Sequence, residues 1–446
     1  MKKIIALLLA AIMLLGLAAC SAKTESTGQE PAAEEATTEA SSEAAPADAA
    51  ADGSLPYEGV VLKYWFPPFT GEDQSYWDDR FAQFEAETGA KVEVTIVPWG
   101  EMGTKYMSGF MSDAGPDVFY MISGLMFDIV DAGIALDLDP YYTEEEKADQ
   151  LFWSAGNCLG GQYASPFAAG VSFRGLCFNM DLLKAAGVDA VPTTTTELIE
   201  AAQKIKDANV CEYPVLYPAT NDSAAMLCSL LPTMYSHGGQ WISDDGEKCL
   251  LNSEENLAAL QYLYDLVYTY EVMPKDVTSL NAQAGLDLFA EGKVAIVATE
   301  PGYVMGQEYP FEWTASIGVS DGTHPVRTVS PLDMMSVNAN SENVEAAVAL
   351  LKWVTTAEQR DNFRETNYPT LAQMNASAAP ITYDVPSIAA CMEQMGEVGL
   401  TNPICRGAAS MDEILYTNFQ LMMMDELTPQ EALDAMQRGC DAALAG

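Results

Sequence analysis

Histidine and positive charge are scarce in this chain of 446 residues. It has two histidines, His237 and His324, and none of the common serine-hydrolase, zinc-protease or nucleotide-binding motifs. Lys and Arg number 21 against 64 Asp and Glu, so the formal net charge is −43 at pH 7. A nucleic-acid surface needs clustered basic side chains, and this excess of acid also disfavours a polyanionic ligand. We therefore expect no nucleic acid among its partners.

Long apolar runs are missing except near the N-terminus. Lys2 and Lys3 precede an apolar run over residues 4–15, and small residues lead up to Cys20. This is the layout of a secretory signal, and the run is too short for a permanent membrane helix. A cysteine directly after Leu-Ala-Ala resembles a bacterial lipobox, which implies that residues 1–20 are a lipoprotein signal peptide and that Cys20 carries the lipid. The alternative is an ordinary signal with an incidental cysteine.

Aromatic residues are absent from residues 21–54, which consist mainly of Ala, Glu, Thr, Ser and Pro. Such a segment buries too little apolar surface to offset the entropy lost on ordering. We predict a disordered acidic tether between the membrane and a folded body at residues 55–446. The body is long enough for two lobes with separate cores.

Closely paired cysteines, which a zinc site requires, are also absent. Beyond Cys20 the chain has Cys158, Cys177, Cys211, Cys228, Cys249, Cys391, Cys405 and Cys440. An exported protein can form disulfides, but the spacing does not show which pairs would form. We expect buried free thiols, no bound metal and no cofactor.

What the body does contain is an alternation of strand and helix patterns. An alternating run over 171–178 predicts a strand, and Asp181 is a candidate N-cap for the helix after it. Thr194-Thr195-Thr196-Glu197 and Thr428-Pro429-Gln430-Glu431 fit capping boxes. Strands that alternate with helices imply βαβ units, so we predict an α/β fold.

Several of these segments resemble the extracellular solute-binding proteins (family 1) of ABC importers, which include maltodextrin-binding proteins. The matching stretches are Gly175-Leu176 with Phe178-Asn179, Ala186-Gly187 with Pro192-Thr193, Phe81 to Val92, Gly115-Pro116-Asp117-Val118-Phe119, Phe289-Ala290-Glu291-Gly292-Lys293-Val294-Ala295, and Asn338 with Leu351-Lys352-Trp353.

The resemblance implies a two-lobed, periplasmic-binding-protein-like (type II) fold with a ligand cleft and a hinge between the lobes. Lobe 1 would hold residues 55–166 and 330–373, and lobe 2 residues 167–329 and 374–446. The protein would be a monomer that is lipid-anchored on the extracytoplasmic face of the bacterial cell membrane. It would capture a small solute and deliver it to the ABC permease subunits.

A sugar or oligosaccharide is the ligand we expect, because the loops that follow the predicted strands supply aromatic faces together with polar side chains. In the resembling family an aromatic residue commonly faces the ligand at the turn that Tyr303 occupies here, although Trp is the commoner residue there. The candidate ligand-binding residues are Trp65, Phe66, Phe69, Met121, Ser123, Ser172, Arg174, Asn221, Asp222, Trp241, Glu300, Tyr303, Arg406 and Asp412.

Two other readings stay open at this point. The same fold binds polyamines or peptides in place of sugars. A lipid-anchored glycosidase is a further alternative, since two catalytic carboxylates can come from anywhere in a fold. We expect a binding protein and not an enzyme, and only a glycosidase would turn over nitrophenyl glycosides.

Overall fold

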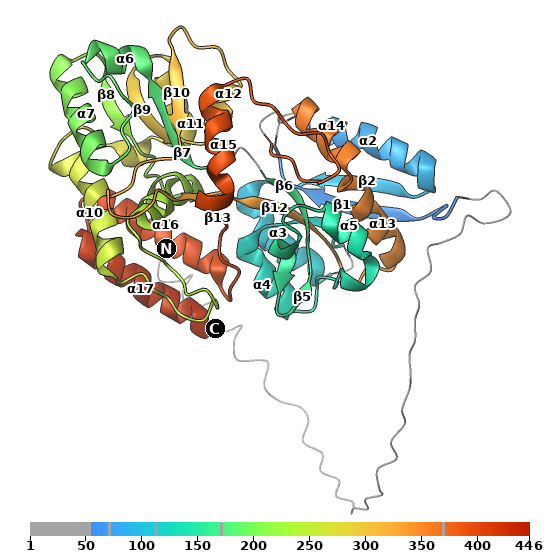
Figure 1. Ribbon diagram of the computed structural model, residues 1–446. Coiled ribbons are helices and arrows are strands. Elements are labelled where there is room, and N and C mark those ends of the chain that lie inside the picture. Colours follow the sequence, from blue (N-terminus) through green and yellow to red (C-terminus); the bar gives the residue numbers. More distant parts are fainter. Residues whose placement is uncertain (1–54, 70–72, 113, 170–172, 368–370) are drawn as a thin grey trace, which may run out of the picture. The chain divides into compact units, whose positions relative to one another are not determined.

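The computed structural model describes residues 55–69, 73–112, 114–169, 173–367 and 371–446. The predicted signal peptide with Cys20, the whole of the predicted tether and Ser172 lie outside the described residues. The folded body is built around two mixed β-sheets with helices packed around them (Figure 1). In the described ranges no helix combines the length and the apolar character that crossing a bilayer requires.

The first sheet forms the centre of lobe 1. Its strand order is β2 (Lys91–Ile96), β1 (Val61–Phe66), β3 (Val118–Met121), β12 (Leu332–Val337) and β6 (Ser165–Ala169). Strand β1 runs parallel to β2 and β3, whereas β12 runs antiparallel to β3 and β6. A core of interlocking aromatic rings includes Tyr64, Phe66, Trp77, Phe167 and Phe363. Since β6 reaches Ala169, the first sheet continues past the boundary expected near residue 166.

The second sheet forms the centre of lobe 2. Its strand order is β10 (Trp313–Ser316), β7 (Gly175–Asn179), β9 (Val294–Thr299) and β8 (Tyr213–Leu216). Strand β7 runs antiparallel to both of its neighbours, and β8 runs parallel to β9. Every residue of β7 and β9 is buried, as is typical of strands covered on both faces.

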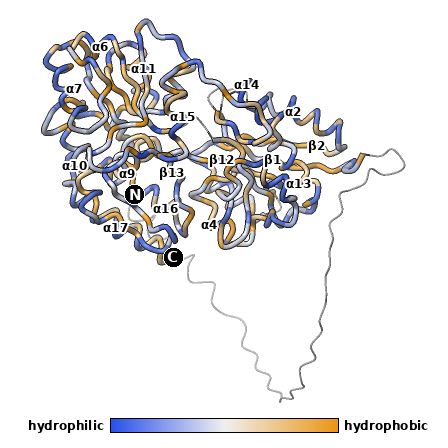
Figure 2. The backbone as a smooth tube through the Cα atoms, viewed as in Figure 1, coloured by the Kyte–Doolittle hydropathy of each residue, from blue (hydrophilic) through white to orange (hydrophobic). Residues whose placement is uncertain are grey.

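Helices complete both lobes, and Figure 2 shows hydrophobic and hydrophilic residues alternating along helices such as α7 and α17. The α-helices are α2 (Asp73–Thr88), α3 (Met102–Phe110), α4 (Ser123–Asp131), α5 (Glu144–Asp149), α6 (Met180–Ala185), α7 (Thr195–Ala208), α8 (Ser223–Ala225), α9 (Leu231–Ser236), α10 (Glu254–Tyr268), α11 (Ala282–Ala290), α12 (Pro301–Met305), α13 (Val344–Val354), α14 (Ala357–Asn367), α15 (Pro386–Val398), α16 (Ala408–Met423) and α17 (Pro429–Ala445). Short 3-10 helices are η1 (Trp99–Glu101), η2 (Asp139–Tyr141), η3 (Trp153–Gly156) and η5 (Val277–Ser279), and η4 (Met226–Leu230) is a π-helix. Two small ladders pair β4 (Asn157–Cys158) with β5 (Gly161–Gln162) and β11 (Thr328–Val329) with β13 (Gly399–Leu400).

Helix starts test the sequence-based predictions most directly. The capping boxes at Thr194 and Thr428 are both confirmed, because each Thr side chain accepts from the amide of a Glu whose carboxylate accepts from the Thr amide. The prediction that Asp181 is an N-cap is wrong. Strand β7 runs to Asn179, whose side chain accepts from the Leu182 amide at 3.1 Å, so Asp181 lies inside the first turn.

Three chain segments meet where the sheets join. The Arg174 amide donates to the Val329 carbonyl at 3.1 Å, and the Thr328 hydroxyl donates to the Arg174 carbonyl. Strand β11, which contains both Thr328 and Val329, pairs in parallel with β13. Chain passages from one sheet to the other therefore lie side by side at this point, which is the arrangement that a hinge requires.

The eight described cysteines are all free thiols, and six of them are buried. Burial raises the pKa of the Cys228, Cys391 and Cys405 thiols to about 11. These thiols are therefore protonated at neutral pH and pack as small apolar groups.

Candidate functional site

A pocket of about 370 Å³ is lined by both lobes and by the segments that join them. Its lining from lobe 1 comprises Pro68, Phe69, Trp99, Tyr120, Ile122, Ser123, Gly124, Leu332, Asp333 and Leu371. The other lining residues are Arg174, Ser223, Met226, Leu227, Glu300, Tyr303, Pro331, Asn402 and Asp412. We call this the interlobe pocket.

Six of the fourteen candidate residues come together in the interlobe pocket although they are far apart in the sequence. They are Phe69, Ser123, Arg174, Glu300, Tyr303 and Asp412. Phe69 and Glu300 follow strands, and Ser123, Tyr303 and Asp412 lie near the starts of helices. Arg174 directly precedes β7.

Three candidates from lobe 1 are core residues and do not line the interlobe pocket. Trp65, Phe66 and Met121 lie within β1 and β3, and their side chains are buried in the lobe 1 core. The Trp65 ring lies so close to Gly109 that a Cβ there would come within 2.6 Å of it. None of these three residues lines the interlobe pocket, so the structure does not support the expectation that they contact the ligand.

Four candidates from the rest of the chain also lie outside the interlobe pocket. Asn221 accepts from the Thr417 hydroxyl at 2.9 Å, and Asp222 caps α8. Trp241 is buried in the lobe 2 core and borders a different cavity. Arg406 forms an ion pair with Asp131 at 3.1 Å. Each of these side chains has a structural partner or a packing role.

An ion pair between Arg174 and Glu300 is central to the polar part of the pocket. Arg174 precedes β7 and Glu300 follows β9, and the register Gly175↔Thr299 places them opposite each other. Their side chains are only 14% and 6% exposed. Burial alone would lower the pKa of Arg174, but the facing carboxylate holds it above its ordinary value. Arg174 therefore stays charged, and its positive charge is largely balanced by the facing Glu300 within the protein.

Asp333 supplies a second carboxyl group. It lies in β12 at an irregularity in the pairing with β6, and the Tyr120 hydroxyl donates to its Oδ1. Burial and then the charge of Glu300 raise the pKa of Asp333 to about 7, against the opposing effects of Tyr120 and Arg174. The protonated form of Asp333 therefore persists to a higher pH than that of an exposed aspartate. Asp333 could not be expected here from sequence reasoning that looked to the loops after strands, since it lies inside a strand.

Asp412 supplies a third carboxyl group, from the first turns of α16. Its Oδ2 lies 3.4 Å from the place where a Cβ would stand on Gly124, near the start of α4. The start of α4 therefore lies directly beside this carboxylate. Burial raises the pKa of Asp412 to about 7, and no described residue gives it a hydrogen bond or an ion pair. Its oxygens are therefore open to a donor from a ligand.

Aromatic rings also line the pocket. Trp99 is 48% exposed and Tyr303 is 50% exposed. The Trp99 indole donates to the Pro68 carbonyl at 2.9 Å and meets the Phe69 and Tyr120 rings edge-on. Trp99 was not among the candidate residues predicted from the sequence. It lies shortly after β2, however, and the expectation that loops after strands contact the ligand applies to it as well.

Tyr303 owes its exposure to a local structure that differs from the expected turn. Pro301 opens the short helix α12, whose N-cap is Glu300. Proline fits the first helical position because it lacks only an amide that the helix does not use. The helix buries Val304 and turns the Tyr303 ring outward.

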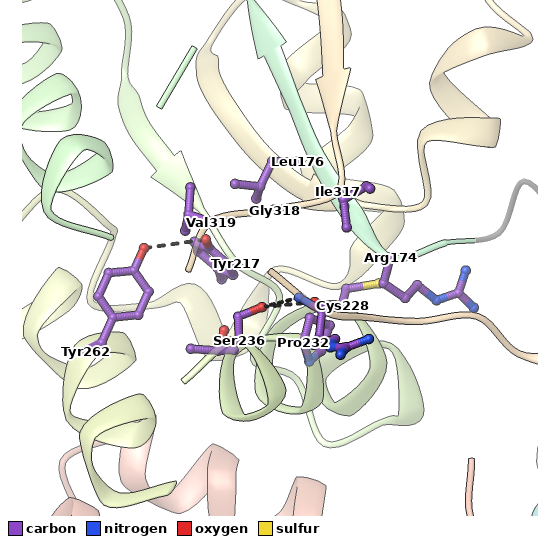
Figure 3. A pocket seen from close by; sticks show the side chains of 13 residues that line it. Arg174, Leu176, Tyr217, Cys228, Pro232, Ser236, Tyr262, Ile317, Gly318 and Val319 are labelled. Carbon is purple, nitrogen blue, oxygen red and sulfur yellow. Dashed lines mark hydrogen bonds between the residues drawn. The ribbon is translucent and has the colours of Figure 1, made fainter. Parts of the chain in front are cut away.

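A much smaller cavity of about 20 Å³ lies behind Arg174 in lobe 2 (Figure 3). Tyr217 and Tyr262 share a hydrogen bond of 3.5 Å beside it, and the Ser236 hydroxyl donates to the Arg327 carbonyl at 2.9 Å. The cavity has room for about one water molecule. This cavity is therefore too small for a solute, whereas the interlobe pocket has room for one.

Among the residues that the structure describes, no group of three or more metal-ligating side chains could hold a metal ion. The interlobe pocket offers half-exposed aromatic rings and acceptor oxygens. Such a site binds a solute that has both an apolar face and hydrogen-bond donors.

Comparisons with known proteins agree with this geometry. The profile of the family described as bacterial extracellular solute-binding protein matches residues 70–361. A binding protein from Brucella abortus is 24% identical over 384 residues, which cover 84% of this chain and 91% of that protein. The diacetylchitobiose binding protein DasA of Streptomyces coelicolor is 25% identical over 303 residues, covering 66% of this chain and 62% of DasA.

The solved structures show the fold. The cyclic alpha-maltosyl-1,6-maltose binding protein from Arthrobacter globiformis matches with a TM-score of 0.71 at 21% identity, covering 86% of this chain and 99% of that one. The prediction of an α/β, two-lobed, periplasmic-binding-protein-like fold is thereby confirmed.

Proposed function

This chain belongs to the family of bacterial extracellular solute-binding proteins, and from this premise we propose that it captures a sugar or oligosaccharide in the interlobe pocket for an ABC importer. Membership of the family implies an extracytoplasmic location. DasA and the Arthrobacter protein carry sugar ligands in their names, which supports the choice of ligand class.

The observation that carries the proposal is the pairing of exposed rings with acceptor oxygens in one pocket. A sugar ring presents an apolar face to an aromatic ring, and its hydroxyls donate to carboxylates in the plane of the ring. Trp99 and Tyr303 supply half-exposed rings, while Asp333 and Asp412 supply the carboxyl groups. A volume of about 370 Å³ lies within the usual range for small-molecule sites.

A polyamine or peptide ligand and a glycosidase activity remain the competing functions. The family and its structural neighbours are binding proteins. Glu300 is held by Arg174, so it is poorly placed to act as a general acid. We propose that the protein catalyses no reaction, and incubation with nitrophenyl glycosides tests this directly.

The finer features of the protein are proposals as well. Cys20 would be the lipidated first residue of a mature, monomeric protein tethered at the membrane. Ligand would bring the lobes together about the segments near Arg174, Val329 and Leu400 and present a closed form to the permease subunits.

The experiment is a thermal-shift screen of the protein without its signal peptide against mono- and oligosaccharides, spermidine and short peptides. A solute that binds only the native state raises the melting temperature by mass action. At least one sugar should do so. A shift with spermidine or a peptide and none with any sugar would refute the sugar assignment.

A further inference from the structure

The charged groups that face the interlobe pocket are unequal in sign. Of the described residues in its lining, Arg174 carries the positive charge, and Glu300, Asp333 and Asp412 carry carboxyl groups. Arg174 is engaged with Glu300 in the ion pair. Two carboxyl groups therefore remain to meet a ligand.

The uncharged polar lining adds another acceptor. The Oδ1 atom of Asn402 is buried and has no hydrogen-bond partner among the residues described. Asp333 already receives the Tyr120 hydroxyl, whereas Asp412 receives nothing from the described chain. The pocket therefore contains acceptor oxygens that lack hydrogen-bond donors, and Asp412 is the carboxyl group that receives none from the described residues.

Two kinds of ligand group could donate hydrogen bonds to these acceptors, a hydroxyl and an ammonium group. A hydroxyl donates one hydrogen bond and carries no charge. An ammonium group donates three and also offsets the negative charge of a carboxylate, so its hydrogen bonds to carboxylates are stronger. The half-exposed rings of Trp99 and Tyr303 favour a cation as well, because the face of an aromatic ring is negative.

We propose that the ligand is a sugar with a free, protonated amine, and that this ammonium group binds against Asp412. The inference rests on the proposed function, because the aromatic rings are assigned to the sugar face. It adds the substrate class: amino sugars are preferred over the same sugars bearing a hydroxyl or an acetamido group, and anionic sugars are excluded.

Calorimetric titration of the protein without its signal peptide provides the first test. The probes are glucose, galactose and mannose with their 2-amino and 2-acetamido forms, and the β-1,4-linked dimers cellobiose, chitobiose and diacetylchitobiose. At least one free amine should bind about tenfold or more tightly than its hydroxyl and acetamido analogues, the gain typical of a hydrogen bond to a charged group.

The outcomes separate this inference from the proposed function. If neutral sugars bind and no amino sugar binds more tightly, the inference is wrong and the sugar assignment stands. If spermidine binds and no sugar does, both are wrong. If no amino sugar binds at all, the inference is also wrong.

A pair of variants locates the ammonium site. Asp412→Asn keeps the size of the side chain and removes its charge, so the preference for the amine should fall to within about threefold of the hydroxyl form. Glu413→Gln removes an exposed charge from the adjacent position and should leave the preference intact. Should Asp412 merely balance the positive end of α4, Asp412→Asn would lower the melting temperature while the preference persisted, and the inference would be refuted.

Discussion

The most informative single change is Tyr303→Ala. Half of the Tyr303 side chain is exposed, and it faces the interlobe pocket from the short helix α12. If a sugar ring covers it, roughly 100 Å² of apolar surface leaves water, which contributes about 2.5 kcal/mol, and stacking adds about 0.5–1.5 kcal/mol.

The measurable loss should be smaller than this sum, because binding also costs side-chain and ligand entropy. We expect Tyr303→Ala to weaken sugar binding by roughly 10- to 100-fold, or about 1.4–2.8 kcal/mol, in a calorimetric titration. Tyr303→Phe is the matched control, since it keeps the ring and should stay within about fivefold of the parent.

A melting curve on the same variants decides between a binding role and a structural one. Removal of a core aromatic side chain costs about 3–5 kcal/mol of stability, whereas a half-exposed ring on a surface helix should cost well below 2 kcal/mol. A large fall in melting temperature together with unchanged affinity would refute the stacking role of Tyr303.

Three further predictions concern the anchor, the hinge and the buried carboxyl group. Cys20→Ala should leave the body folded and release the protein from membranes; continued sedimentation with membranes in high salt would place the anchor elsewhere. Saturating sugar should reduce the radius of gyration in small-angle scattering, and an unchanged radius would contradict closure about the segments near Arg174 and Val329. Burial raises the pKa of Asp412 to about 7, so the native state holds a proton that the unfolded chain loses near pH 4, and this carboxyl group costs stability progressively as the pH rises from 4 to 7. Asp412→Asn should therefore raise the free energy of unfolding by about 1–4 kcal/mol at pH 8 and by little at pH 4, and a gain of equal size at both would refute the shift.

Local signals in the sequence were sufficient for much of the fold. Capping boxes at Thr194 and Thr428 depend only on four consecutive residues, so they could be read without any tertiary information. The start of α6 was misplaced from Asn179 to Asp181, because both residue types cap helices and the end of the preceding buried strand decided between them. The turn expected at Tyr303 became a helix for a similar reason, since Pro301 opens either structure.

Which side chains reach the interlobe pocket was decided by the tertiary structure. Strands buried on both faces are apolar throughout, so their sequence does not show which face looks toward a cleft, and Trp65 and Met121 proved to be core residues. Asp333 faces the pocket only because β12 is paired between β3 and β6, and Asp412 only because α16 packs beside α4. The sequence by itself determined the elements, the family and the kinds of residue that meet a sugar. These residues converge on the pocket through contacts between positions hundreds of residues apart. Local sequence patterns do not reveal such contacts.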